Sequence, residues 1–571
     1  MDKDVHISPQ QTEYDAIVVG SGVTGGWAAK EFTEKGLNTL VLERGRNVTH
    51  GEDYITEHKP SWEMDYHGRG DKQEMQEHYP RQSMAGPVNA YNKHFFVKDS
   101  EHPYAFDDDE PFLWVRGYHL GGRSITWGRQ SYRWSEMDFR ANDRDGVTEG
   151  WPIGYQDVAP WYSKVEKYIG LSGMEEGLPQ LPDSEFLPPM ELNAVEQHVE
   201  EGLEGAFPNR DLTIGRAAIL TQNHKGRQAC HYCGPCSRGC TVGAYFSSLS
   251  STLPAARQTG NLTIECDSIV HSVIHDPDTG KATGVRVIDR ETNKTREVKG
   301  RVVFLCASAM GSTKILLNST SSRYPNGLAN SSGTLGHYIM DHHFKIGASG
   351  TFPGFEDTYY HGHRPNGVYI PRFRNLPGQE SEVDFLRGYG YQGSAYREGW
   401  SRAINEEGIG ADLKSKIRDP GQWRMALTAF CETLPYEDNY VELDDEETDQ
   451  WDIPQLRFHV SLGENEAKMR EDAKTQAAEM LKAAGGTDVE TYEARYWPGE
   501  GIHEMGGARM GRDPETSVLN QWNQTHDVDN LFVTDGACMT SSACQNPSLT
   551  YMALTARAVD YAVSEMKKGN L

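Results

Sequence analysis

The segment "VVGSGVTGG" (residues 18–26) decides the fold of this chain. A short apolar strand at residues 16–19 leads into it, and a helical pattern that includes Trp27 and Phe32 follows it. A second apolar strand reads "NTLVLERG" (residues 38–45). A strand, a glycine-rich turn, a helix and a second strand, in this order, predict a βαβ unit of a nucleotide-binding domain.

Three glycines of this segment, Gly20, Gly22 and Gly25, have the spacing G-x-G-x-x-G. Glycine at these positions allows a tight turn, lets the backbone approach a pyrophosphate, and lets the helix pack on the strand. Glu43 ends the second strand, where a carboxylate can accept a hydrogen bond from a ribose hydroxyl. The alternative is a glycine-rich turn without a ligand, but the strand, helix and acid together favour a dinucleotide site, for FAD or for NAD.

The composition excludes some classes of partner. The chain has 571 residues and a formal net charge of −27, so its surface would repel nucleic acid. No stretch is long and apolar enough to predict a membrane span. Residues 1–15 lack the basic and apolar parts of a secretory signal, which indicates either a cytoplasmic protein or a subunit exported with a signal-bearing partner.

The remaining pattern alternates between α/β segments and a β-rich middle. Residues 51–110 have weak periodicity and are expected to form long loops, which are often functional. The expected elements are strands within 261–306, short strands within 344–462, a helix over 469–481, a strand within 530–536 and a helix over 551–566.

Two further segments, "RGYHLGGRSITWG" (residues 116–128) and "IHEMGGARMG" (residues 502–511), resemble the glucose–methanol–choline (GMC) family of FAD oxidoreductases, as do "NLFVTDGACM" and "NPSLTYMALTARA" after them. The likeness runs from about residue 14 to residue 563. It implies an α/β fold in which a Rossmann-like FAD-binding domain is interrupted by a β-rich substrate domain. The expected division is an FAD-binding domain in three parts (1–170, 260–345 and 495–571), an insertion with a cysteine loop (171–259) and a substrate-binding domain (346–494).

The resemblance implies that FAD is the cofactor, and it assigns a loop to the flavin. Gly121, Gly122 and Ser124 match the loop that lies against the flavin. Pyranose oxidases carry a histidine in this motif that bonds covalently to FAD, whereas this chain has Thr126 before Trp127. We therefore expect FAD to be bound without a covalent link.

The rest of the expected cofactor site lies far along the chain. Val270 matches the strand residue whose backbone meets adenine, and Asp535 and Gly536 match a turn near the pyrophosphate and ribityl chain. The pattern, including "WPIGYQDVAPWY" (residues 151–162), most resembles the sugar-oxidising branch of the family, which includes pyranose oxidases and bacterial glucose and glucoside dehydrogenases.

His503 and Asn546 match the catalytic histidine and asparagine of this branch. An alcohol can give up a hydride from carbon only as its hydroxyl proton leaves, and a neutral imidazole is a suitable base for that proton. An amide can hold the same oxygen and stabilise its developing charge. Without the motif, His503 could be a structural histidine, and Asn546 before Pro547 could be a turn former.

The segment "CHYCGPCSRGC" (residues 230–240) gathers four of the nine cysteines with the spacing C-x2-C-x2-C-x3-C. Disulfides are disfavoured in a large chain without a compartment signal. Structural zinc sites usually divide their ligands between two separated pairs. The spacing is that of bacterial ferredoxins and favours an iron–sulfur cluster. The expected ligands are Cys230, Cys233, Cys236 and Cys240, and the resemblance to the bacterial dehydrogenases implies a [3Fe–4S] cluster.

The resemblance therefore predicts an FAD-dependent sugar dehydrogenase, similar to glucoside 3-dehydrogenases. Such an enzyme would oxidise a secondary ring hydroxyl, at C3 of a glucoside, to a ketone and pass electrons through the cluster to an external acceptor. Its family implies a small chaperone-like subunit that carries the export signal, a cytochrome c acceptor and a periplasmic location. The alternatives are a peroxide-forming oxidase with a structural metal, or a non-catalytic flavin and iron–sulfur electron carrier. A carrier would need no base such as His503.

Overall fold

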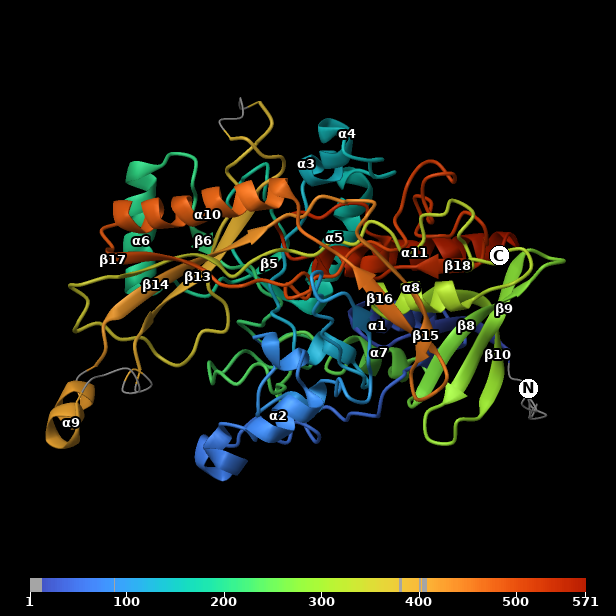
Figure 1. Cartoon of the computed structure of the whole chain (residues 1–571), viewed down its shortest axis with the longest axis horizontal. Helices are drawn as coiled ribbons and strands as arrows, with labels where there is room; N and C mark the ends of the chain where they lie inside the picture. Colours follow the sequence, from blue (N-terminus) through green and yellow to red (C-terminus); the bar gives the residue numbers. More distant parts are fainter. Residues whose placement is uncertain (1–12, 87, 379–382, 400–401, 403–407, 419) are drawn as a thin grey trace.

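The computed structural model describes residues 13–86, 88–378, 383–399, 402, 408–418 and 420–571. The two largest sheets occupy opposite ends of the molecule (Figure 1). In the described part of the chain, no helix is both long and apolar enough to cross a membrane.

The first sheet contains the predicted βαβ unit. Strand β1 (Tyr14–Val19) pairs in parallel with β2 and with β10, and β10 also pairs in parallel with β18. The N-terminal part of β10 pairs instead with the antiparallel strand β9, and β9 pairs in turn with β8. The other strands of this sheet are β2 (Thr39–Leu42), β7 (Leu262–Glu265), β8 (Ser268–Asp276), β9 (Lys281–Asp289), β10 (Thr295–Leu305) and β18 (Leu531–Val533).

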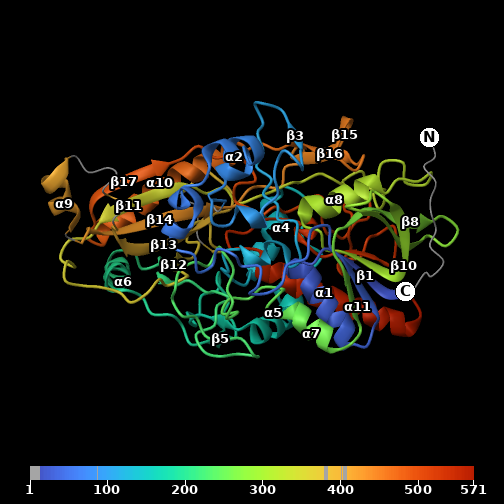
Figure 2. The same ribbon diagram turned by 90° about the horizontal axis from the view of Figure 1, so that it is seen from below.

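Helices cover the parallel part of this sheet. Helix α1 (Val23–Glu34) begins directly after Gly22, which has no side chain to cap it, so its first N–H groups are left for a ligand. It packs against α7 (Thr252–Gln258) and α11 (Ser548–Lys568), as Figure 2 shows. Helix α5 (Tyr155–Ile169) lies against α11, and α8 (Ala309–Asn318) lies against β8.

The second sheet is antiparallel and is formed mainly by the middle of the chain. Helix α10 (Glu464–Ala483) packs on β11, β14 and β17, and α6 (Ala194–Ala206) packs on α10. The strand order is β17 (Thr487–Glu493), β11 (Ile346–Thr351), β14 (Trp423–Cys431), β13 (Tyr389–Arg397), β12 (Val368–Ile370) and β6 (Thr213–Ile214).

Smaller elements complete the structure. A hairpin of β15 (Tyr440–Thr448) and β16 (Pro454–His459) pairs with β3 (Ala105–Phe106). The short strands β4 (Leu171–Ser172) and β5 (Phe186–Leu187) pair in parallel. The remaining helices are α2 (Lys72–His78), α3 (Glu136–Phe139), α4 (Ala141–Asp145) and α9 (Gly410–Arg418).

The predicted fold class is confirmed: a mixed α/β domain with a nucleotide-binding βαβ unit adjoins a β-rich domain. The helix expected over 469–481 extends from residue 464 to residue 483, and the closing helix extends from residue 548 to residue 568. Residues 51–110 are mostly loops, as expected, with short helices and the two-residue strand β3. The predicted domain boundaries remain a prediction.

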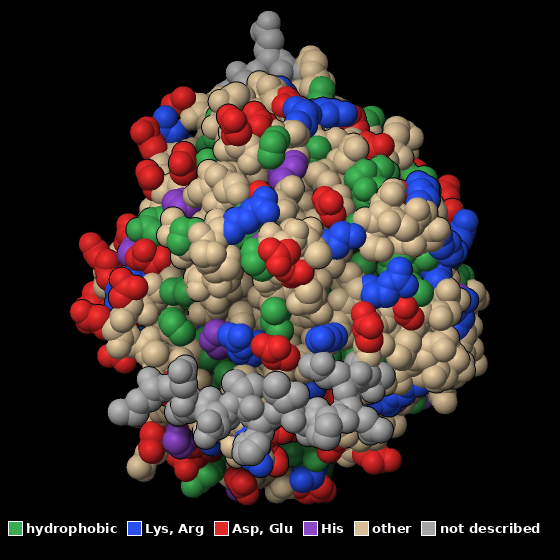
Figure 3. All heavy atoms as spheres, turned by 90° about the vertical axis from the view of Figure 1, so that its right-hand side faces the viewer, with side chains coloured by type: hydrophobic (Ala, Val, Ile, Leu, Met, Phe, Trp, Pro, Cys, Tyr) green, Lys and Arg blue, Asp and Glu red, His purple; other side chains and the backbone are tan. Residues whose placement is uncertain are grey.

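Charged side chains of both signs lie on the surface. Figure 3 shows acidic and basic side chains interspersed over one face, with hydrophobic side chains singly or in small groups. The core lies beneath both sheets. It includes Trp27 and Phe32 of α1, which are fully buried in two different hydrophobic clusters.

Candidate active site

The three glycines after β1 have different environments. A Cβ at Gly20, where φ is +95°, would lie 2.4 Å from the carbonyl oxygen of Cys306, and one at Gly25 would lie 1.9 Å from the carbonyl oxygen of Gly20. A Cβ at Gly22 would meet no protein atom within 4 Å, and Gly22 lines a cavity. Gly20 and Gly25 therefore allow the turn and the helix packing, and Gly22 leaves room for a ligand against the backbone.

Glu43 is held rigidly at the end of β2. Its Oε2 accepts hydrogen bonds from the backbone N–H and the hydroxyl of Ser21, at 3.1 and 2.5 Å, and its Oε1 accepts one from the N–H of Gly45 at 2.9 Å. Burial raises the pKa of this carboxyl, and these hydrogen bonds oppose the increase. Glu43 also lines the cavity, so it is fixed where a ribose hydroxyl could meet it.

The predicted flavin loop lies on the first glycine loop. The N–H of Gly121 donates to the hydroxyl of Ser21 at 2.9 Å, and a Cβ at Gly122 would lie 3.4 Å from Cα of Gly22. The Ser124 hydroxyl accepts a hydrogen bond from the N–H of Ser248 at 3.0 Å. The two loops, a hundred residues apart in sequence, thus form one wall.

Both loops and the predicted catalytic pair line a single cavity of about 590 Å³. Gly25 and Gly121 lie beneath its surface, Gly25 against Gly20 and Gly121 against Leu249. Contact of FAD with the predicted cofactor-binding residues remains a prediction. The predicted residues that line the cavity are Gly20, Gly22, Glu43, Gly122, Ser124, Val270, His503, Asp535, Gly536 and Asn546.

A group of charged residues that the sequence did not reveal forms another part of the lining. Asp449, at the tip of the β15–β16 hairpin, lies 3.3 Å from Nη2 of Arg44 and 3.6 Å from Nζ of Lys314. Burial and the charge of Arg44 lower the pKa of Lys314 to about 7, although Asp449 opposes this. Arg44 and Lys314 both line the cavity, so this ion-pair cluster holds the hairpin tip beside it.

The catalytic candidates lie next to each other. The Nδ2 of Asn546 donates to Nε2 of His503 at 3.2 Å, and Nε2 of Gln392 donates to Oδ1 of Asn546 at 2.6 Å. The Nδ1 of His503 lies 2.8 Å from Nδ1 of His342. The sequence analysis missed Gln392 and His342, although the apolar surroundings of "MDHHF" (residues 340–344) are a signal of buried histidines.

The electrostatics of this group favour a neutral imidazole. Burial, His342 and Arg123 lower the pKa of His503 well below its usual value. Arg123 is paired with Glu504 through two contacts, at 3.2 and 2.8 Å. Burial and the charge of Glu504 raise the pKa of Asp341 to about 7, and Asp341 accepts the backbone N–H of His503 at 2.9 Å. His503 is therefore neutral at neutral pH, and one of its ring nitrogens can accept a proton.

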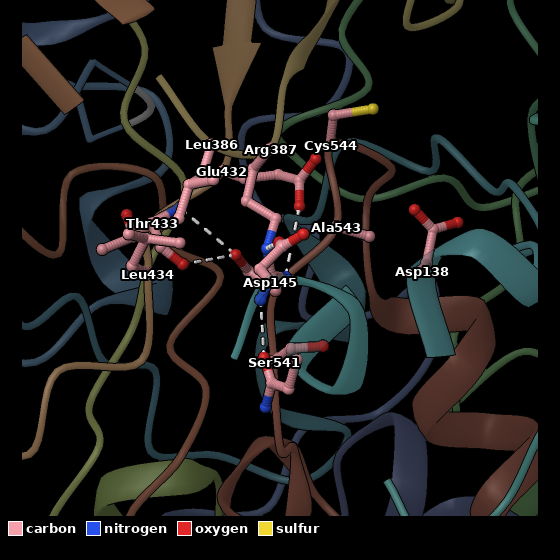
Figure 4. Close-up of polar contacts among 12 residues, drawn as sticks. Asp138, Asp145, Leu386, Arg387, Glu432, Thr433, Leu434, Ser541, Ala543 and Cys544 are labelled. Carbon is pink, nitrogen blue, oxygen red and sulfur yellow. Dashed lines mark hydrogen bonds and ion pairs between the residues drawn. The ribbon is translucent and has the colours of Figure 1, made fainter. Parts of the chain in front are cut away.

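The segment that carries Asn546 is anchored to the end of β14. The Ser542 hydroxyl accepts the N–H of Thr433 at 3.2 Å and donates to the carbonyl oxygen of Thr433 at 2.8 Å. Beside this segment, the buried Arg387 forms two ion pairs (Figure 4). Its Nε lies 2.5 Å from Oδ2 of Asp145, and its Nη1 lies 3.8 Å from Oε2 of Glu432. The two hydrogen bonds of Ser542 thus anchor the segment that leads to Asn546.

The cysteine loop lies at the edge of the same cavity, which Ser237 lines. Cys230, Cys236 and Cys240 pack against one apolar cluster, whereas Cys233 is exposed. All nine cysteines are free thiols, so the disulfide alternative has no support. Among the described residues, no group of three or more histidine, cysteine or acidic side chains is arranged to hold a metal ion. The iron–sulfur cluster therefore remains a prediction.

The chain is similar to several characterised oxidoreductases over nearly its whole length. It is 28% identical to 2-methyl-1,2-propanediol dehydrogenase of Mycolicibacterium austroafricanum, covering 96% of this chain and 94% of that protein. It is 25% identical to the fructose dehydrogenase large subunit of Gluconobacter japonicus, covering 99% of this chain and 100% of that protein. It is also 25% identical to paromamine 6'-oxidase of Streptomyces fradiae, covering 97% of this chain and 92% of that protein.

Among solved structures, pyridoxine 4-oxidase from Mesorbium loti has the same fold, with a TM-score of 0.58 over 96% of this chain and 99% of that one. At 15% identity, this likeness concerns the fold alone. Two profiles of one family, described as GMC oxidoreductase, match residues 14–344 and 435–555. The chain therefore belongs to the GMC oxidoreductase family, as an FAD-dependent enzyme that acts on CH–OH groups.

Proposed function

We propose that this enzyme is a sugar dehydrogenase that oxidises a secondary ring hydroxyl, at C3 of a glucoside, to a ketone. One observation carries the proposal: the His503–Asn546 pair opens on the same cavity as the dinucleotide glycine loop. Two relatives, named as a fructose dehydrogenase subunit and a paromamine oxidase, act on sugar-like alcohols, which supports a carbohydrate substrate.

The residues divide the chemistry between them. His503 accepts the hydroxyl proton at Nε2, and the Asn546 amide donates to the same substrate oxygen. FAD, when bound, supplies the acceptor for the hydride that leaves the substrate carbon. Loss of this hydride and proton turns a secondary alcohol into a ketone. Gln392 keeps the Asn546 amide oriented, because it occupies Oδ1 and leaves Nδ2 free to face His503.

The walls beside this pair suit a polar ring. The rings of Phe344 and Phe430 are stacked, with their centroids 5.4 Å apart. Both rings line the cavity, together with the side-chain amides of Gln130 and Gln392. An aromatic surface can cover the apolar face of a sugar, and the amides can hydrogen-bond its hydroxyls. A long-chain alcohol would cover these amides without bonding to the hydrogen-bonding atoms that Asn546 and Tyr132 leave free, at a cost of about 1–3 kcal/mol for each group that it buries.

The cysteine loop provides the proposed route for electrons. Four thiolates suit iron–sulfur ligation, and Cys230, Cys233, Cys236 and Cys240 would hold the cluster. Such a cluster would supply one-electron transfer chemistry at this place. Its loop is tied to the cavity wall through Arg129, whose Nη1 donates to the carbonyl oxygens of Trp127 and, at 3.3 Å, of Cys236.

Two buried arginines near this loop support an anionic group there. Arg129 and Arg227 are 8% and 5% exposed, and their hydrogen bonds to described residues go to backbone carbonyl oxygens and not to carboxylates. Nε of Arg129 and Nη1 of Arg227 have no hydrogen-bond partner. Buried charges are normally paired, so these two cations fit a cluster whose thiolates carry negative charge. The present positions of the thiols do not form a ligand set, so metal analysis must decide.

The decisive experiment is anaerobic reduction of the purified enzyme with a panel of glycosides. Bleaching of the flavin absorbance, with a keto-glycoside as product, is expected. If no glycoside bleaches the flavin, the sugar dehydrogenase proposal is wrong, and an electron carrier gains support. Iron, sulfide and zinc analysis with a peroxide assay in air separates the dehydrogenase from an oxidase with a structural zinc.

The proposed acceptor and location follow from the same family likeness. Relatives named as a large subunit and as a flavoprotein of gluconate 2-dehydrogenase support a partner subunit. We propose that a small signal-bearing subunit accompanies this chain to the periplasm and that a cytochrome c accepts the electrons. Cell fractionation of the source organism tests this location, and identification of any small protein that co-purifies with this chain tests the partner.

A further inference from the structure

His342 is a fully buried histidine that the proposed mechanism does not use. Both of its ring nitrogens have partners: Nδ1 lies 2.8 Å from Nδ1 of His503, and Nε2 lies against the carbonyl oxygen of Ala543. A buried side chain that touches the base through one nitrogen and the backbone through the other can control where the base carries its proton.

The carbonyl of Ala543 determines the tautomer of His342. A carbonyl oxygen only accepts hydrogen bonds, so Nε2 of His342 must carry the proton that it donates. Burial lowers the pKa of His342 to about 4, so the ring is neutral at neutral pH and carries a single proton. Its Nδ1 is therefore a bare acceptor.

The tautomer of His342 in turn determines the tautomer of His503. Because Nδ1 of His342 is an acceptor, Nδ1 of His503 must donate to it, and the single proton of the neutral His503 ring lies there. Its Nε2 then carries no proton, and the lone pair of this atom can accept a hydrogen bond. This agrees with Asn546, whose Nδ2 donates toward Nε2 because Gln392 already donates to its Oδ1. The hydrogen bonds thus run in one direction, from Gln392 to Asn546, His503, His342 and the Ala543 carbonyl.

We propose that His342 is a positioning residue that holds His503 in the Nδ1–H tautomer, so that Nε2 is the atom that accepts the substrate proton. The inference rests on the proposed role of His503 as the base. It adds that the Ala543 carbonyl selects the reactive nitrogen through two imidazole rings.

The surrounding backbone prevents both rings from escaping this arrangement. Asp341 accepts the backbone N–H of His342 at 2.8 Å and of His503 at 2.9 Å. The Tyr496 hydroxyl donates to the carbonyl oxygen of His342 at 2.6 Å. The Ala543 carbonyl belongs to the segment that Ser542 ties to β14 and that Figure 4 shows beside the buried ion pairs. The terminal acceptor is thus as fixed as the two rings.

The adjacent His343 offers a matched control. It is also fully buried, and its Nε2 bonds to the carbonyl oxygen of Glu432 at 3.0 Å, but its Nδ1 has no partner. Replacing either histidine by leucine removes a buried imidazole and one bond to a carbonyl. Only His342→Leu also removes the acceptor for Nδ1 of His503.

The first measurement is the tautomer itself. Ring nitrogen shifts of ¹⁵N-histidine-labelled holoenzyme, assigned with His503→Gln, should show a protonated Nδ1 and a bare Nε2 for His503. In His342→Leu, the signal should become a mixture of tautomers, whereas His343→Leu should leave it unchanged. A wild-type His503 with its proton on Nε2 overturns the proposal, as does a His342→Leu enzyme that keeps the wild-type tautomer.

The second measurement is anaerobic flavin reduction with methyl β-D-glucopyranoside, or with whichever glycoside of the panel bleaches the flavin. Loss of the tautomer should lower the limiting rate by between about 10-fold and about 10⁴-fold, because the wrong tautomer disables a catalytic histidine. The substrate concentration for half-maximal rate should change little. The His343→Leu rate should stay within a few-fold of wild type.

The two proposals fail in different ways. If the nitrogen shifts are as expected but His503→Gln reduces its flavin at the wild-type rate, then His503 is not the base, and the tautomer assignment still holds. If His503→Gln is inactive but His342→Leu keeps both the tautomer and the rate, the base is correct, and the positioning role of His342 is wrong.

Discussion

Replacing Gly22 by alanine should weaken FAD binding without weakening the fold. Gly22 has a φ of −65°, which alanine adopts without strain, and the added Cβ would meet no protein atom within 4 Å. Such a substitution stabilises a protein by about 0.4–1 kcal/mol, because it restricts the unfolded chain. The FAD-free variant should therefore melt at or slightly above the wild-type temperature.

The cost should appear when FAD binds. The new methyl group would project into the cavity where the pyrophosphate is expected to approach the backbone. Forcing a methyl group into a closely packed contact costs about 1–3 kcal/mol. That range corresponds to an increase of about 5-fold to 150-fold in the dissociation constant for FAD.

Two other glycines provide the controls. At Gly25, a Cβ would lie 1.9 Å from the carbonyl oxygen of Gly20, so Gly25→Ala must displace backbone and should destabilise the fold by about 3 kcal/mol or more. Gly205 lies in α6 with open space around its Cβ position. Gly205→Ala should stabilise the helix by up to about 1 kcal/mol and leave FAD binding unchanged.

The assay combines thermal unfolding of the FAD-free proteins with titration of FAD, followed by quenching of flavin fluorescence. If Gly22→Ala binds FAD as tightly as wild type does, the backbone at Gly22 does not face the pyrophosphate, and the expected placement of the cofactor is wrong. If Gly22→Ala melts well below wild type, its environment has been misjudged.

His503→Ala should keep FAD but reduce the flavin about 10²–10⁴-fold more slowly with a glycoside, and Asn546→Ala should be milder, as stopped-flow absorbance can measure. The flavin should leave the protein on mild acid denaturation, because Thr126 replaces the linking histidine, and its fluorescence should appear in the supernatant. Cys233→Ser should lower the iron content and slow electron transfer to a one-electron dye while flavin reduction continues, since a hydroxyl is a poor iron ligand. The pKa of Lys314, about 7 against 10.5 in the unfolded chain, makes the unfolded state bind more protons in this interval. The free energy of unfolding, measured in urea, should therefore rise with pH from about 7 to 10, and more weakly in Lys314→Met.

Each of these expectations has a clear contrary result. Near-normal flavin reduction in His503→Ala removes that residue from the base role, and a larger loss in Asn546→Ala would reverse the two roles. Flavin that precipitates with the chain indicates a covalent bond. A Cys233→Ser enzyme that passes electrons at the wild-type rate does not use the loop as a relay. An equal pH slope in Lys314→Met assigns the slope to other groups.

The parts of the fold that local pattern determines could be predicted from the sequence. The βαβ unit was predictable because strand, turn and helix signals are contiguous over some thirty residues, and Gly20, Gly22 and Gly25 have distinct steric reasons to be glycine. The family motifs also made it possible to predict His503 and Asn546 as the catalytic candidates, and the structure places these two residues in contact.

The supporting residues could not be found in this way. His342 reaches His503 across 161 residues, and Gln392 reaches Asn546 across 154, so no local spacing relates them. The contact of Asp449 with Lys314 depends on how the β15–β16 hairpin folds over the first sheet. The geometry of the cysteine loop is also a tertiary property, and its spacing alone did not show that the thiols form a ligand set.

The order of strands in the first sheet also bears on how the enzyme is made. Strand β18 pairs with β10, and the cavity lining extends from Val19 to Tyr551. At translation rates of about 5–20 residues per second, roughly 30–110 s separate the synthesis of these two ends. A nascent chain therefore exposes its glycine loop long before the cavity exists, so FAD can bind only to a nearly finished polypeptide. Free flavin at 100 times its dissociation constant would then stabilise the completed chain by about 2.7 kcal/mol, which makes the yield of folded enzyme depend on flavin supply.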